Sequence, residues 1–276
     1  SRSNLKKRIE KLYVNGEPSK ISRKVLSGDV IEYDLTKEES KDIKAEKIEL
    51  DIIYEDSNVF VINKPAGMVV HPAAGNYSGT MAQGIKYLLE KDETDFSEDD
   101  IRPGIVHRLD KDTSGIIIAA KNTAALNFLS AQFRNREASK TYLAIINGVP
   151  EQNKGRIETL IGRDKNNRKK MTWKTNTGKE AVTEYKVLSS YGDKSFMALS
   201  PKTGRTHQLR VHMLSMKMPI VGDPLYSRQK DDSGLMLHAY KLRIKLPGED
   251  SIREFRVPVA DRFKDMLCEL SATYLK

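Results

Sequence analysis

The side chains best suited to chemistry are concentrated in one short stretch of the chain. Five of the six positions from His107 to Asp112 are ionisable, and Asp110 lies among them. The small residues at 113–115 predict a turn, and the continuous β-branched run that follows at 116–120 predicts a buried strand. A polar cluster tied to a core strand is where a rigid scaffold can present a reactive carboxylate. Taken alone, the pattern also suits a polar turn with an ion-paired aspartate.

The common cofactor and metal motifs are missing from the sequence. The glycine-rich segment 79–84 continues with Ile85 and Lys86 instead of Lys-Ser/Thr, so it does not encode a phosphate-binding P-loop. No dinucleotide fingerprint follows a predicted strand, and no Gly-x-Ser-x-Gly elbow indicates a serine hydrolase. A single cysteine cannot build a thiolate zinc site, and the histidines are scattered at His71, His107, His207, His212 and His238. We therefore expect chemistry without a metal or cofactor.

The composition is typical of an intracellular protein that binds nucleic acid. The 276 residues carry a formal net charge of +9 and a pI of about 9.3, and an excess of this kind suits a polyanion. An indifferent basic surface is the alternative. The single cysteine, Cys268, rules out an internal disulfide, fits a reducing compartment and is expected to pack inside a helix. No apolar run approaches the roughly 18 residues of a membrane span, so we expect a cytoplasmic protein without a membrane partner.

Composition divides the chain into three parts. Residues 1–35 form a small basic module, in which a short helix at 3–11 and a strand at 30–33 are expected. Residues 36–47 are rich in Lys, Glu and Asp without apolar periodicity, which is typical of a linker. Residues 48–276 then contain enough apolar sequence for one large domain.

Strands and helices alternate irregularly in the large domain, which predicts an α+β fold with a mainly antiparallel sheet and flanking helices. Apolar alternation and turn residues predict strands at 48–54, 59–63, 140–147, 182–189, 195–200, 235–245 and 252–257. Helical spacing of apolar residues predicts helices at 80–91, 123–136, 206–216 and 260–272. The acidic segment 91–100 is expected to be a mobile loop.

Two basic segments are candidates for contact with a nucleic acid backbone. Residues 1–24 hold eight Lys or Arg against two acids, and Lys6, Lys7 and Arg8 are the densest part. The loop-like stretch 153–180 holds nine Lys or Arg against three acids, with a tryptophan that could stack on a base. Its strongest candidates are Arg168, Lys169 and Lys170. A solvated helix face and a solvated hairpin tip are the alternatives.

Three segments in order resemble a known family. The sequence His-Arg-Leu-Asp-Lys-Asp-Thr-Ser-Gly at 107–115 resembles the signature of the RluA family of pseudouridine synthases. Lys-Thr-Tyr-Leu-Ala at 140–144 resembles its second motif, and Thr-Gly-Arg-Thr-His-Gln-Leu-Arg-Val-His-Met at 203–213 resembles its third. The resemblance extends from about residue 48 to the end of the chain. It implies the pseudouridine synthase fold.

The resemblance also implies the reaction and its nucleophile. Enzymes of this family detach uracil from its ribose at N1 and reattach it through C5, with an aspartate that matches Asp110. A carboxylate suits this step because C–N cleavage creates positive character at C1′. Asp110 could bond covalently to the substrate, or it could take a proton from C2′ and give a glycal intermediate. Asp112 is the rival carboxylate, but the family motif places the nucleophile directly after Arg-Leu.

Three further residues match functional positions of the family. Arg210 matches the arginine that pairs with the catalytic aspartate and would hold it ionised. Tyr142 matches the active-site tyrosine, whose phenol could stack on the base and relay a proton. Arg108 matches the residue that fills the space left by a flipped uridine, and the chemistry requires such flipping. Alone, each would suggest ordinary packing or a surface ion pair.

The N-terminal module narrows the expected substrate. Its pattern resembles the latter part of an S4 RNA-binding domain, without the helix that begins that domain. An S4 module ahead of this domain is similar to the RluD-type branch, which modifies large-subunit ribosomal RNA. The resemblance therefore implies an enzyme that acts on 23S ribosomal RNA or its assembly precursor, and we expect a monomer. The alternatives are a pseudouridine synthase for tRNA or another rRNA site, and a non-catalytic RNA-binding or ribosome-assembly factor.

Overall fold

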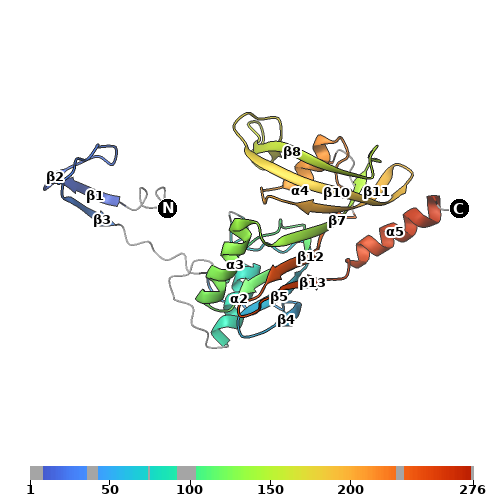
Figure 1. Cartoon of the computed structure of the whole chain (residues 1–276), viewed down its shortest axis with the longest axis horizontal. Coiled ribbons are helices and arrows are strands. Elements are labelled where there is room, and N and C mark those ends of the chain that lie inside the picture. The colour runs from blue at the N-terminus through green and yellow to red at the C-terminus, as the bar shows by residue number, and fades with distance from the viewer. Residues whose placement is uncertain (1–8, 36–42, 74, 92–103, 228–232, 275–276) are drawn as a thin grey trace. The chain divides into compact units, whose positions relative to one another are not determined.

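The computed structural model describes residues 9–35, 43–73, 75–91, 104–227 and 233–274. The chain forms two compact units, residues 1–42 and 43–276, which we describe separately. The described part of the first unit is an antiparallel sheet with strand order β2-β1-β3. Its strands are β1 Ile9–Val14, β2 Glu17–Pro18 and β3 Ile31–Leu35, drawn in blue in Figure 1.

The prediction of a helix at residues 3–11 is wrong for residues 9–11, which the structure describes. Residues 9–11 begin β1 instead, and β1 pairs with β3 in a register that sets Leu12 opposite Tyr33. Pairing with a second strand satisfies the backbone groups of β1, and this tertiary contact overrides a weak helical pattern. Residues 3–8 lie outside the described residues. The strand expected at 30–33 is confirmed as β3.

The second unit is built on one ten-stranded sheet with order β4-β5-β6-β12-β7-β11-β10-β8-β9, and β13 pairs with β12. Only the β6–β12 pair is parallel among the strands described, so the predicted mainly antiparallel mixed sheet is confirmed. Figure 1 shows β4 and β5 in one half of the unit and β8, β10 and β11 in the other, with β7 and β12 between them. The strands are β4 Ile52–Glu55, β5 Val59–Lys64, β6 Ser114–Ala120, β7 Ser139–Asn147, β8 Lys154–Arg163, β9 Met171–Thr172, β10 Lys179–Tyr191, β11 Lys194–Pro201, β12 Leu237–Lys245 and β13 Ile252–Arg256.

Helices cover both faces of the sheet where β5 and β6 lie. Phe60 and Ile62 of β5 pack in one core cluster with residues of the first helix, whereas Val59 and Val61 face a second cluster with residues of the next helix. Alternate side chains of a strand point to opposite faces, so burial on both faces requires the continuous apolar runs seen in the sequence. The helices are α2 Met81–Lys91, α3 Thr123–Asn135, α4 Gln208–Ser215 and α5 Asp261–Tyr274. Among those described, none is long and apolar enough to cross a membrane.

A glycine permits the close parallel contact between β6 and β12. Gly115 has φ +113°, and a Cβ atom at this position would lie 2.3 Å from the carbonyl oxygen of Ala239. Only glycine fits such a backbone approach. The expected turn at 113–115 is therefore wrong at its end, since Ser114 and Gly115 already belong to β6. The strand thus begins four residues after Asp110, which ties that loop to the centre of the sheet.

Several expected boundaries change. The strand expected from residue 48 begins at Ile52, and the helix expected from residue 206 begins at Gln208. The stretch 153–180 is only partly a loop, because residues 154–163 form β8, which pairs with β10, and residues 171–172 form β9. From residue 154 to residue 161, exposed and less exposed residues alternate along β8, and the charged residues of this strand are exposed. Cys268 is exposed on α5 instead of packed, because Phe263 and Leu270 define the buried face of that helix.

Part of the expected linker belongs to the second unit. The backbone N–H of Glu46 donates to the carbonyl of Gln83, and its side chain accepts from the N–H of Gly79. Ile43 is buried as well. Residues 36–42 and the acidic segment 92–100 lie outside the described residues.

Candidate functional site

The loop that carries Asp110 is fixed from below by a buried lysine. The Nζ atom of Lys64 donates to the carbonyl oxygens of Pro65, Met68 and Lys111 at 2.8, 2.8 and 2.9 Å. The N–H of Gly67 also donates to the Lys111 carbonyl. Two separate donors therefore hold the residue that follows Asp110, so the position of its backbone is set by β5 and by the turn after it.

Lys64 is itself an unusual group for a protein interior. Its side chain is fully buried, and this burial lowers its pKa to about 7 although the charges of Asp112 and Asp110 oppose the shift. A positive charge below the loop complements the two carboxylates above it. The sequence analysis did not identify Lys64, because its role depends on contacts across 47 positions of the chain.

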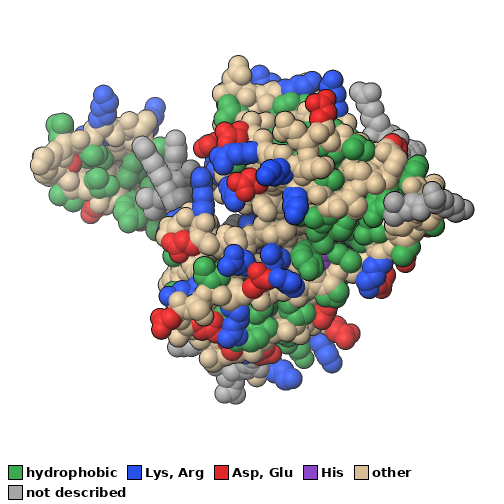
Figure 2. All heavy atoms as spheres, turned by 45° about the vertical axis from the view of Figure 1, so that its right-hand side comes forward, with side chains coloured by type: hydrophobic (Ala, Val, Ile, Leu, Met, Phe, Trp, Pro, Cys, Tyr) green, Lys and Arg blue, Asp and Glu red, His purple; other side chains and the backbone are tan. Residues whose placement is uncertain are grey.

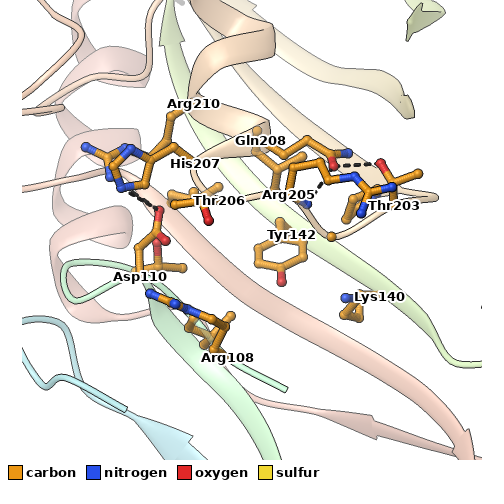
Figure 3. A pocket seen from close by; sticks show the side chains of 16 residues that line it. Arg108, Asp110, Lys140, Tyr142, Thr203, Arg205, Thr206, His207, Gln208 and Arg210 are labelled. Carbon is orange, nitrogen blue, oxygen red and sulfur yellow. Dashed lines mark hydrogen bonds and ion pairs between the residues drawn. The ribbon is translucent and has the colours of Figure 1, made fainter. Parts of the chain in front are cut away.

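Asp110 is paired with Arg210, as the family resemblance implies. The Nη1 atom of Arg210 lies 3.3 Å from Oδ2 of Asp110, and the Asp110 side chain is 19% exposed. Arg210 comes from the first turn of α4 and is almost completely buried. Figure 3 shows this ion pair at one side of the pocket, with the carboxylate accessible from it.

A second carboxylate fixes the guanidinium. Asp223 accepts from Nε and Nη2 of Arg210 at 2.8 Å each, and its Oδ1 also accepts the backbone N–H groups of Leu225 and Tyr226. Such a planar fork orients the guanidinium, so that Nη1 is left to face Asp110. Burial alone would lower the pKa of Arg210, but the hydrogen bonds and charges of Asp223 and Asp110 outweigh it and raise the pKa. The sequence analysis assigned no role to Asp223.

Tyr142 and Arg108 complete the same pocket. Tyr142 lies in the middle of β7, is 7% exposed, and has a pKa raised by burial and by the charge of Asp110. Its phenol is therefore protonated at neutral pH. Arg108 is exposed at the mouth of the pocket. The four predicted residues Asp110, Tyr142, Arg210 and Arg108 thus line one cavity of about 110 Å³ (Figure 3).

The rival carboxylate faces elsewhere. Asp112 is absent from the lining of the pocket that holds Asp110, Tyr142 and Arg210, and its charge acts on Lys64 and Arg262 instead. It does line a neighbouring hollow that also reaches Asp110. The geometry therefore favours Asp110 over Asp112 as the reactive carboxylate.

His207 is a pocket residue to which the sequence analysis assigned no role. It directly precedes α4, adopts a left-handed backbone with φ 55°, and places Nε2 3.9 Å from Oδ2 of Asp110. Burial lowers its pKa below the usual range, with the charges of nearby acids and arginines acting in both directions. The only sign in the sequence that His207 belongs to the site was its position within the third motif, next to Gln208. Within the described residues, no group of three or more His, Cys, Asp or Glu side chains could hold a metal ion.

A wide groove opens from the pocket and is strongly basic. It measures about 780 Å³, and of its described lining residues six are Lys or Arg and none is acidic. We call it the basic groove. Figure 2 shows Lys and Arg side chains gathered on a hollowed face of the second unit. The six cations come from the loop before β6, the end of α3, the start of β7 and the turn after β11, and they are Arg108, Arg134, Arg136, Lys140, Lys202 and Arg205.

The basic cluster that the sequence analysis singled out at residues 168–170 is not part of the described lining of this groove. Arg168, Lys169 and Lys170 lie in the connection between β8 and β9, where Arg168 and Lys169 are exposed. Lys170 lies 6.0 Å from the ring centre of Tyr226, which stands behind the pocket. Lys6, Lys7 and Arg8 lie outside the described residues.

Comparison with known proteins gives one consistent result. A family model described as RNA pseudouridylate synthase matches residues 58–215. The ribosomal large subunit pseudouridine synthase D of Borreliella burgdorferi is 44% identical over 249 residues, which cover 88% of this chain and 76% of that protein. An uncharacterized RNA pseudouridine synthase of Bacillus subtilis is 40% identical over 258 residues, covering 92% of this chain and 84% of that protein. The solved structure of human RNA pseudouridylate synthase domain containing 4 superposes with a TM-score of 0.64 at 28% identity, covering 79% of this chain and 92% of that one.

Proposed function

Because the chain belongs to the RNA pseudouridylate synthase family, we propose that it isomerises specific uridines of large-subunit ribosomal RNA to pseudouridine at the pocket around Asp110. The observation that carries the assignment of the pocket is the buried chain of charges in which Asp223 orients Arg210 and Arg210 faces Asp110. The relatives named as ribosomal large subunit pseudouridine synthase D support the choice of RNA.

Asp110 is the nucleophile in this proposal. Arg210 lies 3.3 Å from the carboxylate and orients it, and Arg210 is itself held in place because Asp223 accepts from its Nε and Nη2 atoms. Loss of uracil from C1′ creates positive character on the sugar, which a fixed carboxylate stabilises or captures. Abstraction of a proton from C2′ would use the same carboxylate in the same place.

Tyr142 serves the base and Arg108 serves the RNA stack. The raised pKa of Tyr142 keeps its phenol protonated, so it can donate a proton or a hydrogen bond while its ring stacks on uracil. Arg108 is exposed at the pocket mouth, and a long planar cation there can fill the gap left by a flipped nucleotide. Free rotation of uracil between its N1 and C5 attachments requires that it first leaves the stack.

The strand that flanks the flipped uridine lies along the basic groove in this proposal. The groove and the pocket share Arg108, Lys140 and Arg205, so RNA bound in the groove would present its bases at the pocket mouth. Cations without nearby acids in the lining suit phosphates. The β8–β9 connection with Arg168–Lys170, and an S4-like first unit with Lys6–Arg8, would add contacts farther along the RNA.

Neutralising the basic groove is expected to weaken RNA binding and its dependence on salt. The variant Arg134→Gln/Arg136→Gln removes two exposed cations at the end of α3, each worth a slope of about 0.7 to 0.9 in log Kd against log salt if it contacts a phosphate. Filter binding at several salt concentrations measures this slope, which should fall by one to two. The matched control is Arg243→Gln/Arg256→Gln on β12 and β13, outside the groove, which should leave the slope unchanged.

The experiment that tests the function uses unmodified ribosomal RNA. The protein is incubated separately with large-subunit rRNA transcripts and with tRNA transcripts, and pseudouridines are mapped by carbodiimide-dependent stops in primer extension. We expect new stops with the wild-type protein and none with Asp110→Asn. Stops in tRNA alone would replace the proposed substrate while keeping the reaction. Binding without any new stop in either RNA would replace the enzyme by a non-catalytic RNA-binding factor.

A further inference from the structure

His207 carries a hydrogen-bond donor that the proposed chemistry of Asp110 and Tyr142 does not use. Its ring lines the pocket with them, and its Nε2 atom is 3.9 Å from Oδ2 of Asp110. This distance exceeds that of a hydrogen bond. Figure 3 shows the His207 ring beside Arg210, on the same side of the pocket as the carboxylate. The Nε2 atom is therefore available to a bound substrate.

A relay of hydrogen bonds determines which nitrogen of His207 carries the proton. The backbone N–H of Met171 donates to the hydroxyl oxygen of Tyr226 at 2.7 Å, and that hydroxyl lies 2.8 Å from Nδ1 of His207. Tyr226 is 6% exposed, and burial raises its pKa to about 12, so it keeps its proton and needs an acceptor. Among the described residues, that acceptor is Nδ1. The proton of the neutral imidazole therefore resides on Nε2, which faces the pocket.

The backbone supports a functional role for this orientation. His207 has φ 55°, a backbone conformation that residues other than glycine rarely adopt. Residues in this conformation cluster at functional sites. It occupies the position before α4 where a side chain usually caps the helix, yet its side chain makes no capping bond. The unusual backbone instead turns the ring towards Tyr226 and Asp110.

Burial is the main reason that His207 is neutral. Asp110 and Asp223 favour the protonated ring, whereas burial and the cations Arg210 and Arg108 disfavour it, and the pKa is lowered overall. A neutral ring can donate from Nε2 without forming an ion pair that would reduce the reactivity of Asp110.

We propose that His207 donates its Nε2–H to a carbonyl oxygen of uracil while the uracil carries negative charge. When the C1′–N1 bond breaks, its electron pair remains with uracil and spreads over the ring nitrogen and the carbonyl oxygens. A donor already fixed at that oxygen stabilises the charge without reorganisation. The role is the same whether Asp110 then captures C1′ or removes a proton from C2′. This inference depends on the proposed function of the pocket.

The test compares single-turnover rates at saturating RNA for variants of His207 that suit its left-handed backbone. His207→Gly removes the donor, and glycine suits a φ of 55°. We expect its single-turnover rate to fall about 10²- to 10³-fold, the effect of losing one such donor, while the Kd for RNA stays within about threefold. His207→Gln places an amide N–H near the position of Nε2 and should recover at least tenfold of the loss. Added imidazole should restore part of the His207→Gly rate.

A matched control separates the donor from the backbone. Lys217 is exposed, follows the same helix and has φ 62°, so Lys217→Gly relaxes an equivalent backbone without touching the pocket. Its rate should equal that of the wild type. An unchanged rate in His207→Gly overturns the proposal, and so does a slow His207→Gly that neither glutamine nor imidazole improves. Neither result would affect the proposed function, which is tested separately by the loss of activity in Asp110→Asn.

The pH dependence gives a second readout. Burial lowers the pKa of His207 below its usual value of about 6.5, so above that value the ring is neutral and its single proton resides on Nε2. Glutamine does not titrate. The ratio of wild-type to His207→Gln rates should therefore stay constant between about pH 8.5 and 7, and a ratio that changes in this range would contradict the assigned protonation state.

Discussion

Replacing Asp110 with asparagine is expected to abolish pseudouridine formation while leaving the protein folded. Asparagine has the same shape but is a poor nucleophile and a poor base, so neither route for the glycosidic bond remains. Losses of about 10⁴- to 10⁶-fold are typical when a nucleophile is removed. Single-turnover assays with a short rRNA fragment measure this loss. The side chain is partly exposed and Asp223 continues to hold Arg210, so we expect little change in the unfolding midpoint.

The matched control is Asp112→Asn, two residues along the same loop. It removes an identical charge that faces Lys64 and Arg262 instead of the pocket lining. We expect it to retain activity within about tenfold, since a change of that size corresponds to about 1.4 kcal/mol. A dead Asp112→Asn with an active Asp110→Asn would reverse the assignment of the two carboxylates.

Local patterns in the sequence were sufficient for most of the fold. The apolar runs of β5 and β6 identified strands buried on both faces, and the spacing of apolar residues identified α2, α3 and α5. The helix expected at residues 3–11 failed at Ile9, because pairing between β1 and β3 is a non-local contact that no short window contains. For the same reason β8 was mistaken for a loop: half of its residues are exposed, and its partner β10 begins 16 residues after β8 ends.

The candidate site divides in a similar way. Asp110, Tyr142, Arg210 and Arg108 were identified by resemblance to motifs, and the structure brings them to one pocket. The groups that orient the site residues come from other parts of the chain, and they act through contacts between positions that are distant in sequence. Lys64 reaches the Asp110 loop across 47 positions, and Tyr226 acts on His207 across 19. The basic groove combines cations from four separate segments, so a search for charge runs could not find it.

Asp223→Ala is expected to destabilise the protein strongly as well as inactivate it. The variant leaves the buried guanidinium of Arg210 without its fork, and breaking a buried ion pair from one side costs about 3–5 kcal/mol. Asp110 offers partial compensation at 3.3 Å, so we expect the lower part of this range in the free energy of unfolding. Urea unfolding measures it. Asp193→Ala, which removes an exposed ion pair with Lys194, should cost no more than about 1 kcal/mol.

A double-mutant cycle distinguishes the electrostatic cause from general loss of packing. Arg210→Met removes the guanidinium and keeps much of its apolar bulk, so Asp223→Ala/Arg210→Met contains no unpaired buried cation. We expect the double variant to be more stable than Asp223→Ala alone, because the second change removes the charge that the first change left exposed to a low dielectric. Its activity should stay as low as that of Arg210→Met, because Asp110 has lost the cation that faces it. Additive losses of stability would instead mean that Asp223 acts mainly through its bonds to the backbone of Leu225 and Tyr226.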